Sequence, residues 1–152
     1  MARVHVRSWQ AGYKDLLPDA YLASLTPEER AGRYTFGDQD PLQPQTLVAL
    51  WEERICGFAT TMPAPVPDQG ELAGLYVDPD HWGRGIGTRL LTEARSYLAL
   101  RGFSRAGLWV LSGNTRAQRF YARDGWRPDG VTRGQRIWGI DVQEVSYTRR
   151  LP

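Results

Sequence analysis

Apolar side chains near the beginning of the chain recur at steps of three and four residues. They are Val6, Trp9, Tyr13, Leu16 and Leu17. This spacing predicts a first helix, and Pro18 ends the pattern because proline cannot continue a helix. Residues 19–25 are expected to add another turn or two of helix.

A further helix start follows at residue 26. Thr26 is a good N-cap, Pro27 suits the first helical position, and Glu29 completes a capping box. We expect this helix to run to about Tyr34. Residues 36–45 are rich in glycine, aspartate and proline, which predicts a loop.

Two apolar, β-prone runs over 46–51 and 54–61 flank the polar pair Glu52-Glu53. This arrangement predicts an antiparallel hairpin. An extended loop is expected next, because prolines stand at alternate positions. These prolines are Pro63, Pro65 and Pro67.

From residue 71 the pattern changes from strand to helix. An extended apolar run to Val77 is stopped by Asp78-Pro79-Asp80, and apolar residues at helical spacing follow. Those residues are Leu90, Leu91, Ala94, Tyr97 and Leu98. The helix is expected from about Thr88 to Arg101, with Gly102 as C-cap glycine.

Residues 108–111 are wholly apolar, as in a strand buried on both faces. Strand, helix and strand form a βαβ unit, so these two strands should be parallel with a right-handed crossover. Asn114 then caps a helix that closes near Gly125. The tail offers turn residues at 129–130 and 133–134, and two antiparallel strands are expected there.

Composition limits the class of protein. With 152 residues, 41% hydrophobic and 24% charged, the chain fits one globular domain over 1–152. The net charge of +2 comes from scattered arginines, which does not indicate a nucleic acid partner. No apolar run approaches the roughly 18 residues of a membrane span, and the start lacks a signal peptide. We therefore expect a cytoplasmic protein without a membrane partner.

Metal and thiol chemistry have little support in the sequence. Cys56 is the one cysteine, so no intrachain disulfide can form, and its apolar surroundings favour a small buried hydrophobe over a nucleophile. His5 and His81 have no second histidine or carboxylate at ligand spacing. We predict no metal site.

Three glycines occupy alternate positions of the turn before the residue 88 helix. They are Gly83, Gly85 and Gly87. Such a turn lets a ligand approach the backbone, and the unpaired amides of the helix start favour a phosphate. A tight turn without a ligand is the alternative. The dinucleotide fingerprint fails at Thr88, and no Gly-Lys-Ser/Thr pair of a Walker loop is present.

The segment Trp82-Gly83-Arg84-Gly85-Ile86-Gly87 resembles the first motif of the GNAT acyltransferase superfamily, Gln/Arg-x-x-Gly-x-Gly/Ala. Trp82 replaces the usual Gln or Arg, while the backbone donors from Gly83 to Thr88 remain. The segment from Asn114 to Tyr121, followed by Gly125-Trp126, resembles the second motif, Asn-x-x-Ala-x-x-Phe-Tyr. Both motifs occur in the family's order and spacing.

The resemblance implies an α/β fold of the GNAT type. Its central sheet is mixed and mostly antiparallel, with a V-shaped split between two parallel strands and helices on both faces. Family members usually carry a strand ahead of the first helix. Here that strand is either absent or precedes Met1 in a longer reading frame.

The resemblance also implies an N-acetyltransferase that uses acetyl-CoA and no metal. The acetyl group would pass to a primary amine of a small molecule or peptide by direct attack in a ternary complex. The acceptor, the acyl length and the choice between monomer and homodimer stay open. A non-catalytic acyl-CoA-binding module and an NAD- or ATP-binding domain of another fold are the alternatives.

Two catalytic residues follow from the resemblance. Glu71 matches the family's strand glutamate that acts as general base; an exposed strand-edge carboxylate, with a water chain as base, is the alternative. Tyr121 matches the general acid, and its phenol, with a pKa of about 10, could stabilise a thiolate by hydrogen bonding alone. A backbone N–H near Tyr76 or Val77, at the bulged end of the strand, would bind the carbonyl oxygen.

The residues expected to bind the cofactor lie on both motifs and on the strand before them. They are Leu75, Tyr76, Val77, Trp82, Gly83, Arg84, Gly85, Ile86, Gly87, Thr88, Asn114, Ala117 and Tyr121. Asn114 would contact the pantetheine arm, serve as an N-cap, or do both. Phe120 is expected to pack.

Other side chains are candidates for the donor phosphates or the acceptor. Arg84, Arg89, Arg116 and Arg119 could meet the CoA phosphates, although all except Arg84 are expected to be solvated helix-surface arginines. Four aromatic residues lie on segments that border the acceptor in this family, and core packing is expected for most of them. They are Trp9, Tyr13, Tyr34 and Trp138.

Overall fold

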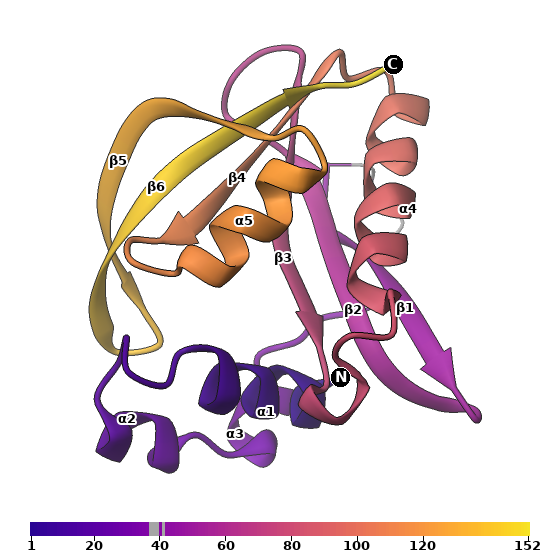
Figure 1. The fold of residues 1–152 in the computed structure, drawn as a ribbon. Helices are drawn as coiled ribbons and strands as arrows, with labels where there is room; N and C mark the ends of the chain where they lie inside the picture. The colour runs from indigo at the N-terminus through magenta and orange to yellow at the C-terminus, as the bar shows by residue number, and fades with distance from the viewer. Residues whose placement is uncertain (37–39, 41) are drawn as a thin grey trace.

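The computed structural model describes residues 1–36, 40 and 42–152. In this part of the chain six strands form one sheet in the order β1-β2-β3-β4-β6-β5 (Figure 1). The strands are β1 (Gln45–Trp51), β2 (Arg54–Pro63), β3 (Gln69–Val77), β4 (Arg105–Leu111), β5 (Arg127–Ile137) and β6 (Ile140–Arg150). The helices are α1 (Ala2–Gly12), α2 (Asp19–Ser24), α3 (Pro27–Ala31), the 3₁₀ turn η1 (Pro79–His81), α4 (Ile86–Leu100) and α5 (Thr115–Arg123).

The sheet is split between its two parallel strands. β3 and β4 pair only over 69–71 and 105–107, whereas β3 stays paired with β2 up to Val77 and β4 stays paired with β6 up to Leu111. All other pairings are antiparallel. The two strands therefore diverge toward their C-terminal ends, as Figure 1 shows. The predicted fold class, including the V-shaped split, is confirmed.

Helices cover both faces of the sheet. On one face, α4 buries the leucines and alanine of its apolar stripe against β3 and β4. These residues are Leu90, Leu91, Ala94 and Leu98. On the opposite face, the His5 ring of α1 lies 5.4 Å from the Phe58 ring and 4.2 Å from the Tyr76 ring. A second cluster joins Trp9 and Leu22 to Leu111 and Val142, so α1 and α2 close the open end of the split.

The first helix differs from the predicted span. It covers residues 2–12, because Gly12 ends it and the chain turns at Asp15, which has a φ of 69°. Leu17 is still buried, but it packs from a turn. The helical spacing of apolar residues thus extended to Leu16 and Leu17 although the helix itself ends at Gly12. The next two predicted helices are confirmed, although α3 ends at Ala31.

Capping and turn predictions can be compared directly. Thr26 accepts a hydrogen bond from the Glu29 amide, and Glu52 and Glu53 form the β1–β2 turn with φ values of 47° and 63°. Of the loop predicted over 36–45, residues 37–39 and 41 lie outside the described residues, and β1 begins at Gln45.

The β5–β6 hairpin does not turn at residues 129–130 or 133–134, where the sequence predicted turns. Trp138 and Gly139, with φ values of 52° and 82°, connect β5 to β6. Asp129-Gly130 instead forms an irregularity within β5, where Asp129 accepts a hydrogen bond from the Ser146 hydroxyl at 2.8 Å. The prediction of two antiparallel strands is confirmed, but its turn positions are wrong.

Candidate active site

Beyond residue 71, the edge of β3 that faces the split has no strand partner. The Asp78 amide donates to the Cys56 carbonyl of β2 at 2.8 Å. Backbone polar groups alternate in direction along a strand, so those of Leu75 and Val77 point away from β2, toward β4. β4 no longer pairs with them there. This edge can accept an extended ligand chain in the manner of an added strand.

A bulge precedes this open edge. The β2–β3 register passes from Thr60 opposite Gly74 to Thr61 opposite Leu72, which leaves Ala73 without a partner. The bulge therefore lies three residues before Tyr76, and not beside Tyr76 and Val77 as the resemblance suggested. The amides that follow it and face the split belong to Leu75 and Val77.

The glycine turn forms an open cradle at the start of α4. Gly83 and Gly85 have φ values of 74° and 77°, and a Cβ at either position would meet nothing within 4 Å. Gly85 is the N-cap and no side chain caps the helix. The first helical bond is donated by Arg89 to Gly85, so the amides of residues 86–88 have no helical acceptor. The cradle fits a phosphate group.

Gly87 has a packing role. It is helical, and a Cβ there would lie 3.5 Å from the Phe120 ring of α5. The missing side chain lets α4 and α5 approach each other beside the split. Phe120 is a packing residue, as the sequence predicted.

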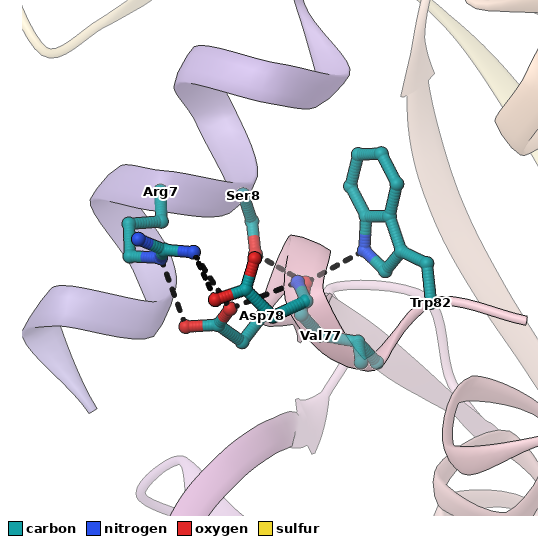
Figure 2. Close-up of polar contacts among 6 residues, drawn as sticks. Arg7, Ser8, Val77, Asp78 and Trp82 are labelled. Atoms are coloured by element: carbon teal, nitrogen blue, oxygen red, sulfur yellow. Dashed lines mark hydrogen bonds and ion pairs between the residues drawn. The ribbon is translucent and has the colours of Figure 1, made fainter. Parts of the chain in front are cut away.

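Trp82 fixes the glycine turn to the end of β3. Its indole Nε1 donates to the Val77 carbonyl at 2.8 Å, and the Ser8 hydroxyl of α1 donates to the same oxygen at 2.8 Å (Figure 2). One carbonyl thus joins three elements that are far apart in the sequence. Trp82 orders the turn through this bond, a contact that the sequence did not suggest.

Ion pairs add to this junction. The Arg7 side chain lies 3.0 Å from Asp78 and 2.8 Å from Asp80, so α1 holds both carboxylates at the start of η1 (Figure 2). Asp78 is buried and also accepts a hydrogen bond from the Asp80 amide. We refer to the contacts among Arg7, Ser8, Val77, Asp78 and Trp82 as the strand-end junction.

Removing the Ser8 hydroxyl tests the strand-end junction. Ser8→Ala should lower the free energy of unfolding by about 1 kcal/mol, because Ser8 is buried and its bond to Val77 is lost. Ser24→Ala is the matched control: Ser24 also donates to a backbone carbonyl, at 2.6 Å, but it is exposed. Urea denaturation measures both. Equal losses for the two variants would contradict a special role for the junction.

α5 presents the second motif to the split. The Asn114 side chain accepts a hydrogen bond from the Ala117 amide at 3.1 Å, so it is an N-cap, and it also lines the cleft. Tyr121 lines the cleft from the same helix. Burial raises the pKa of the Tyr121 phenol, with a smaller contribution from Tyr76. Tyr121 therefore stays protonated and can donate a hydrogen bond.

Glu71 lies where β3 and β4 separate, and it is half-buried. Burial raises the pKa of its carboxyl; nearby Glu144 raises it further, and Arg133 opposes the shift. A carboxylate with a raised pKa is a stronger base than an exposed one. Its position at the split and its pKa both suit a general base.

Sequence reasoning missed three side chains near Glu71. Glu144 is buried and pairs with Arg133 at 2.7 Å, and the Arg133 guanidinium lies 4.0 Å from the Trp109 ring centroid. All three line the cleft. A signal was present, because Glu144 lies two residues from Val142 and from Ser146, on the same, buried side of β6. An acidic residue at a buried strand position favours a functional role.

One cleft of about 890 Å³ brings the predicted site residues together. Among its lining residues are Glu71, Leu75, Tyr76, Val77, Trp82, Gly83, Gly85, Ile86, Gly87, Thr88, Asn114, Ala117 and Tyr121. Arg84 is the predicted residue that does not line it. Its guanidinium lies 5.1 Å from the Trp51 ring centroid, so only the backbone of Arg84 contributes to the glycine turn.

The aromatic residues predicted beside the acceptor side line the cleft but pack on one another. The Trp9 and Trp138 rings are stacked with centroids 4.0 Å apart, and Trp9 meets Tyr13 at 4.8 Å. His5 contacts Tyr34 through a hydrogen bond of 2.5 Å. Burial lowers the pKa of His5 to about 3, and Arg30 adds to the shift, so the imidazole is neutral. They form a wall of fixed rings.

Comparison with known proteins agrees with this geometry. The sequence pattern of the Acetyltransferase (GNAT) family matches residues 8–126. The N-acetyltransferase YuaI of Bacillus subtilis, itself uncharacterized, is 27% identical over 155 residues, which covers 96% of this chain and 83% of YuaI. Some other relatives are matched over only 28–42% of their own length.

Solved structures share the fold. A GCN5-related N-acetyltransferase from Rhodopseudomonas palustris superposes with a TM-score of 0.72 at 24% identity, covering 99% of this chain and 87% of that one. The PaiA N-acetyltransferase from Thermoplasma acidophilum, in complex with coenzyme A, gives a TM-score of 0.70 at 22% identity and covers 98% and 89%. The chain belongs to the GNAT acetyltransferase family. The predicted enzyme class, an acyl-CoA-dependent N-acyltransferase, is the class of this family.

Among the helices of the described residues, none combines the length and the apolar character needed to span a bilayer.

Proposed function

We propose that this protein transfers an acetyl group from acetyl-CoA to a primary amine by direct attack within a ternary complex. One observation carries the proposal. A single cleft joins the glycine cradle, the open edge of β3, Tyr121 and Glu71. A donor thioester and an acceptor amine could therefore meet in one space.

The donor side of the cleft is built from backbone groups. The amides of residues 86–88 would bind the diphosphate. On the free edge of β3, the backbone groups of Leu75 and the amide of Val77 would pair with the amide groups of the pantetheine arm. Asn114 and Ala117 line the same side from α5. When bound, acetyl-CoA supplies the acetyl thioester that reacts.

The acceptor side is built from charged and aromatic side chains. An aliphatic amine has a pKa of about 10.4 and must lose a proton before it attacks a thioester. Glu71 would accept that proton, because its half-buried carboxyl has a raised pKa. Glu144 would help to attract the ammonium form, since it is a second carboxylate beside Glu71.

Two further groups would stabilise charge in the reaction. Negative charge develops on the carbonyl oxygen of the acetyl group, and an amide of Leu75 or Val77 facing the split would donate to it. The sulfur then leaves as a thiolate. Tyr121 would donate a hydrogen bond to the sulfur and keep its proton, because its raised pKa exceeds the roughly 8.5 of a thiol.

Thermal unfolding with ligands tests the proposal first. At a concentration 100-fold above its Kd, acetyl-CoA should stabilise the folded protein by about 2.7 kcal/mol, which raises Tm by about 5–10 °C. NAD and ATP at the same concentration are the controls, since they lack pantetheine. An equal rise with all three would favour a general nucleotide site. No rise with acetyl-CoA would contradict the proposal.

Thioester cleavage with a panel of amines tests the transfer step. We expect CoA release that depends on both acetyl-CoA and one class of primary amine. Binding of acetyl-CoA without turnover against any amine would instead indicate a non-catalytic acyl-CoA-binding module.

A further inference from the structure

The guanidinium of Arg116, on α5, lies over the ring of Trp82. Its guanidinium carbon is 3.5 Å from the Trp82 ring centroid, and both side chains line the cleft. At this distance a planar guanidinium stacks on the indole face, which is the strongest aromatic partner for a cation. The ring itself is held by the bond from Nε1 to Val77. The arginine side chain is thus placed by a fixed platform.

The stack brings a positive charge to the glycine cradle. Trp82 precedes Gly83 directly in the chain, so the guanidinium lies over the residue at which the cradle begins. Trp82 comes from one wall of the cleft and Arg116 from the other, α5. The cation therefore bridges the two walls between which a donor would bind.

Seven ion pairs occur among the described residues, and none of them includes Arg116. Its guanidinium therefore has no acidic partner in this part of the chain. Burial alone lowers the pKa of its guanidinium, and no nearby carboxylate counters that shift. The residue is still exposed, so a guanidinium without a counter-charge beside the cradle is accessible to an anionic ligand.

The other arginines on this side do not offer the same charge. Arg133 lines the cleft but pairs with Glu144 at 2.7 Å. Arg84 stacks outside the cleft on Trp51. Arg123 lines the cleft at the other end of α5, about 10 Å further along the helix axis.

We propose that Arg116, stacked on Trp82, binds the diphosphate of the acyl-CoA donor from the side opposite the glycine amides. The inference rests on the proposed function, because it names a binding residue for the same donor. It also gives a role to Trp82, the position at which the chain departs from the first family motif. Trp82 is then the platform for the cation and does not itself contact the phosphates.

Donor fragments provide the test. Arg116→Gln should weaken acetyl-CoA binding about tenfold in isothermal titration calorimetry, since one charge-assisted hydrogen bond is lost. Acetyl-dephospho-CoA keeps the diphosphate and should show the same tenfold loss. Acetyl-pantetheine has no phosphate, and its Kd should change less than about twofold. Arg119→Gln is the matched control: Arg119 is an arginine one turn along α5 that is exposed like Arg116 but does not line the cleft.

The outcomes separate this inference from the proposed function. Acetyl-CoA binding that is unchanged in Arg116→Gln, or weakened equally for acetyl-pantetheine, would overturn the role of Arg116 alone. A loss with acetyl-CoA but none with acetyl-dephospho-CoA would place the arginine at the 3′-phosphate and overturn the diphosphate assignment. An unaltered protein that does not bind acetyl-CoA would overturn both proposals.

The platform is tested by pairing the two positions. Trp82→Phe keeps an aromatic face but loses the bond from Nε1 to Val77, so it should weaken acetyl-CoA binding clearly less than Trp82→Leu. Trp82→Leu removes the face and should weaken binding about as much as Arg116→Gln. The double variant Trp82→Leu, Arg116→Gln should be no weaker than either single variant, because they disrupt one contact. Multiplied losses would contradict the stack. Tm of each variant shows whether it remains folded.

Discussion

Tyr121→Phe is expected to lower kcat about 100-fold and to leave the KM for acetyl-CoA within about threefold. The phenol would donate its hydrogen bond only as negative charge develops on the departing sulfur, so its loss affects the transition state and not the bound donor. Tyr121 lies in the cleft on the helix that carries the second motif. Steady-state kinetics with acetyl-CoA and the best amine of the panel measure the effect.

The pH dependence of this variant distinguishes hydrogen bonding from proton donation. Burial raises the pKa of Tyr121, so the phenol is protonated throughout the range in which the enzyme can be assayed. The loss in kcat should therefore be the same at every pH. A loss that changes with pH would show that the Tyr121 proton is transferred. Tyr97→Phe is a matched control, because Tyr97 lies on α4 and does not line the cleft. It should keep full activity.

The local backbone conformation at the proposed donor side could be predicted from the sequence because local rules govern it. The glycines at 83 and 85 are required by positive φ, and Asn114 is required by the exposed amide of Ala117. Each of these needs involves residues within a few positions along the chain. Capping and turn preferences therefore predict most of the backbone conformation of the proposed donor side. The two motifs predict the order in which its segments occur along the chain.

The proposed acceptor side depends on contacts between residues that are distant in the sequence. Glu71 is on β3, and the pair of Glu144 with Arg133 joins β6 to β5. No spacing in the sequence connects residue 71 with residue 144. Only the sheet order, in which β6 inserts between β4 and β5, brings them to one cleft. The alternation of side chains along β6 could have marked Glu144 as unusual, but not its partner Arg133.

The β5–β6 turn shows how packing can override turn chemistry. Two-residue turns of this kind usually carry Asn-Gly or Asp-Gly, and such pairs were available nearby. Trp138 instead takes the first turn position with positive φ. Its ring is stacked on Trp9 at 4.0 Å and covered by the Arg30 side chain. The contacts of the indole offset the backbone strain of about 1 kcal/mol, and a local rule cannot include them.

Glu71→Gln is expected to lower kcat about 100-fold near neutral pH. The amide keeps the shape of the side chain but cannot accept the proton of the attacking amine. In the unaltered enzyme, activity should rise with pH through the pKa of Glu71, which burial raises above its ordinary value. This rise should be absent from the variant. The alkaline rise due to the free amine itself should remain in both proteins.

The same substitution should stabilise the fold, which separates a catalytic loss from a structural one. A carboxyl whose pKa is raised on folding binds its proton more tightly in the folded state, so its ionised form destabilises the fold above that pKa. Glu71→Gln removes this cost, and its Tm should exceed that of the unaltered protein at pH 7. The difference should vanish below the unfolded pKa of about 4.3. Glu144→Gln provides the comparison. If it, and not Glu71→Gln, abolishes the rise of activity with pH, the base is Glu144. If neither does, the proton leaves through water.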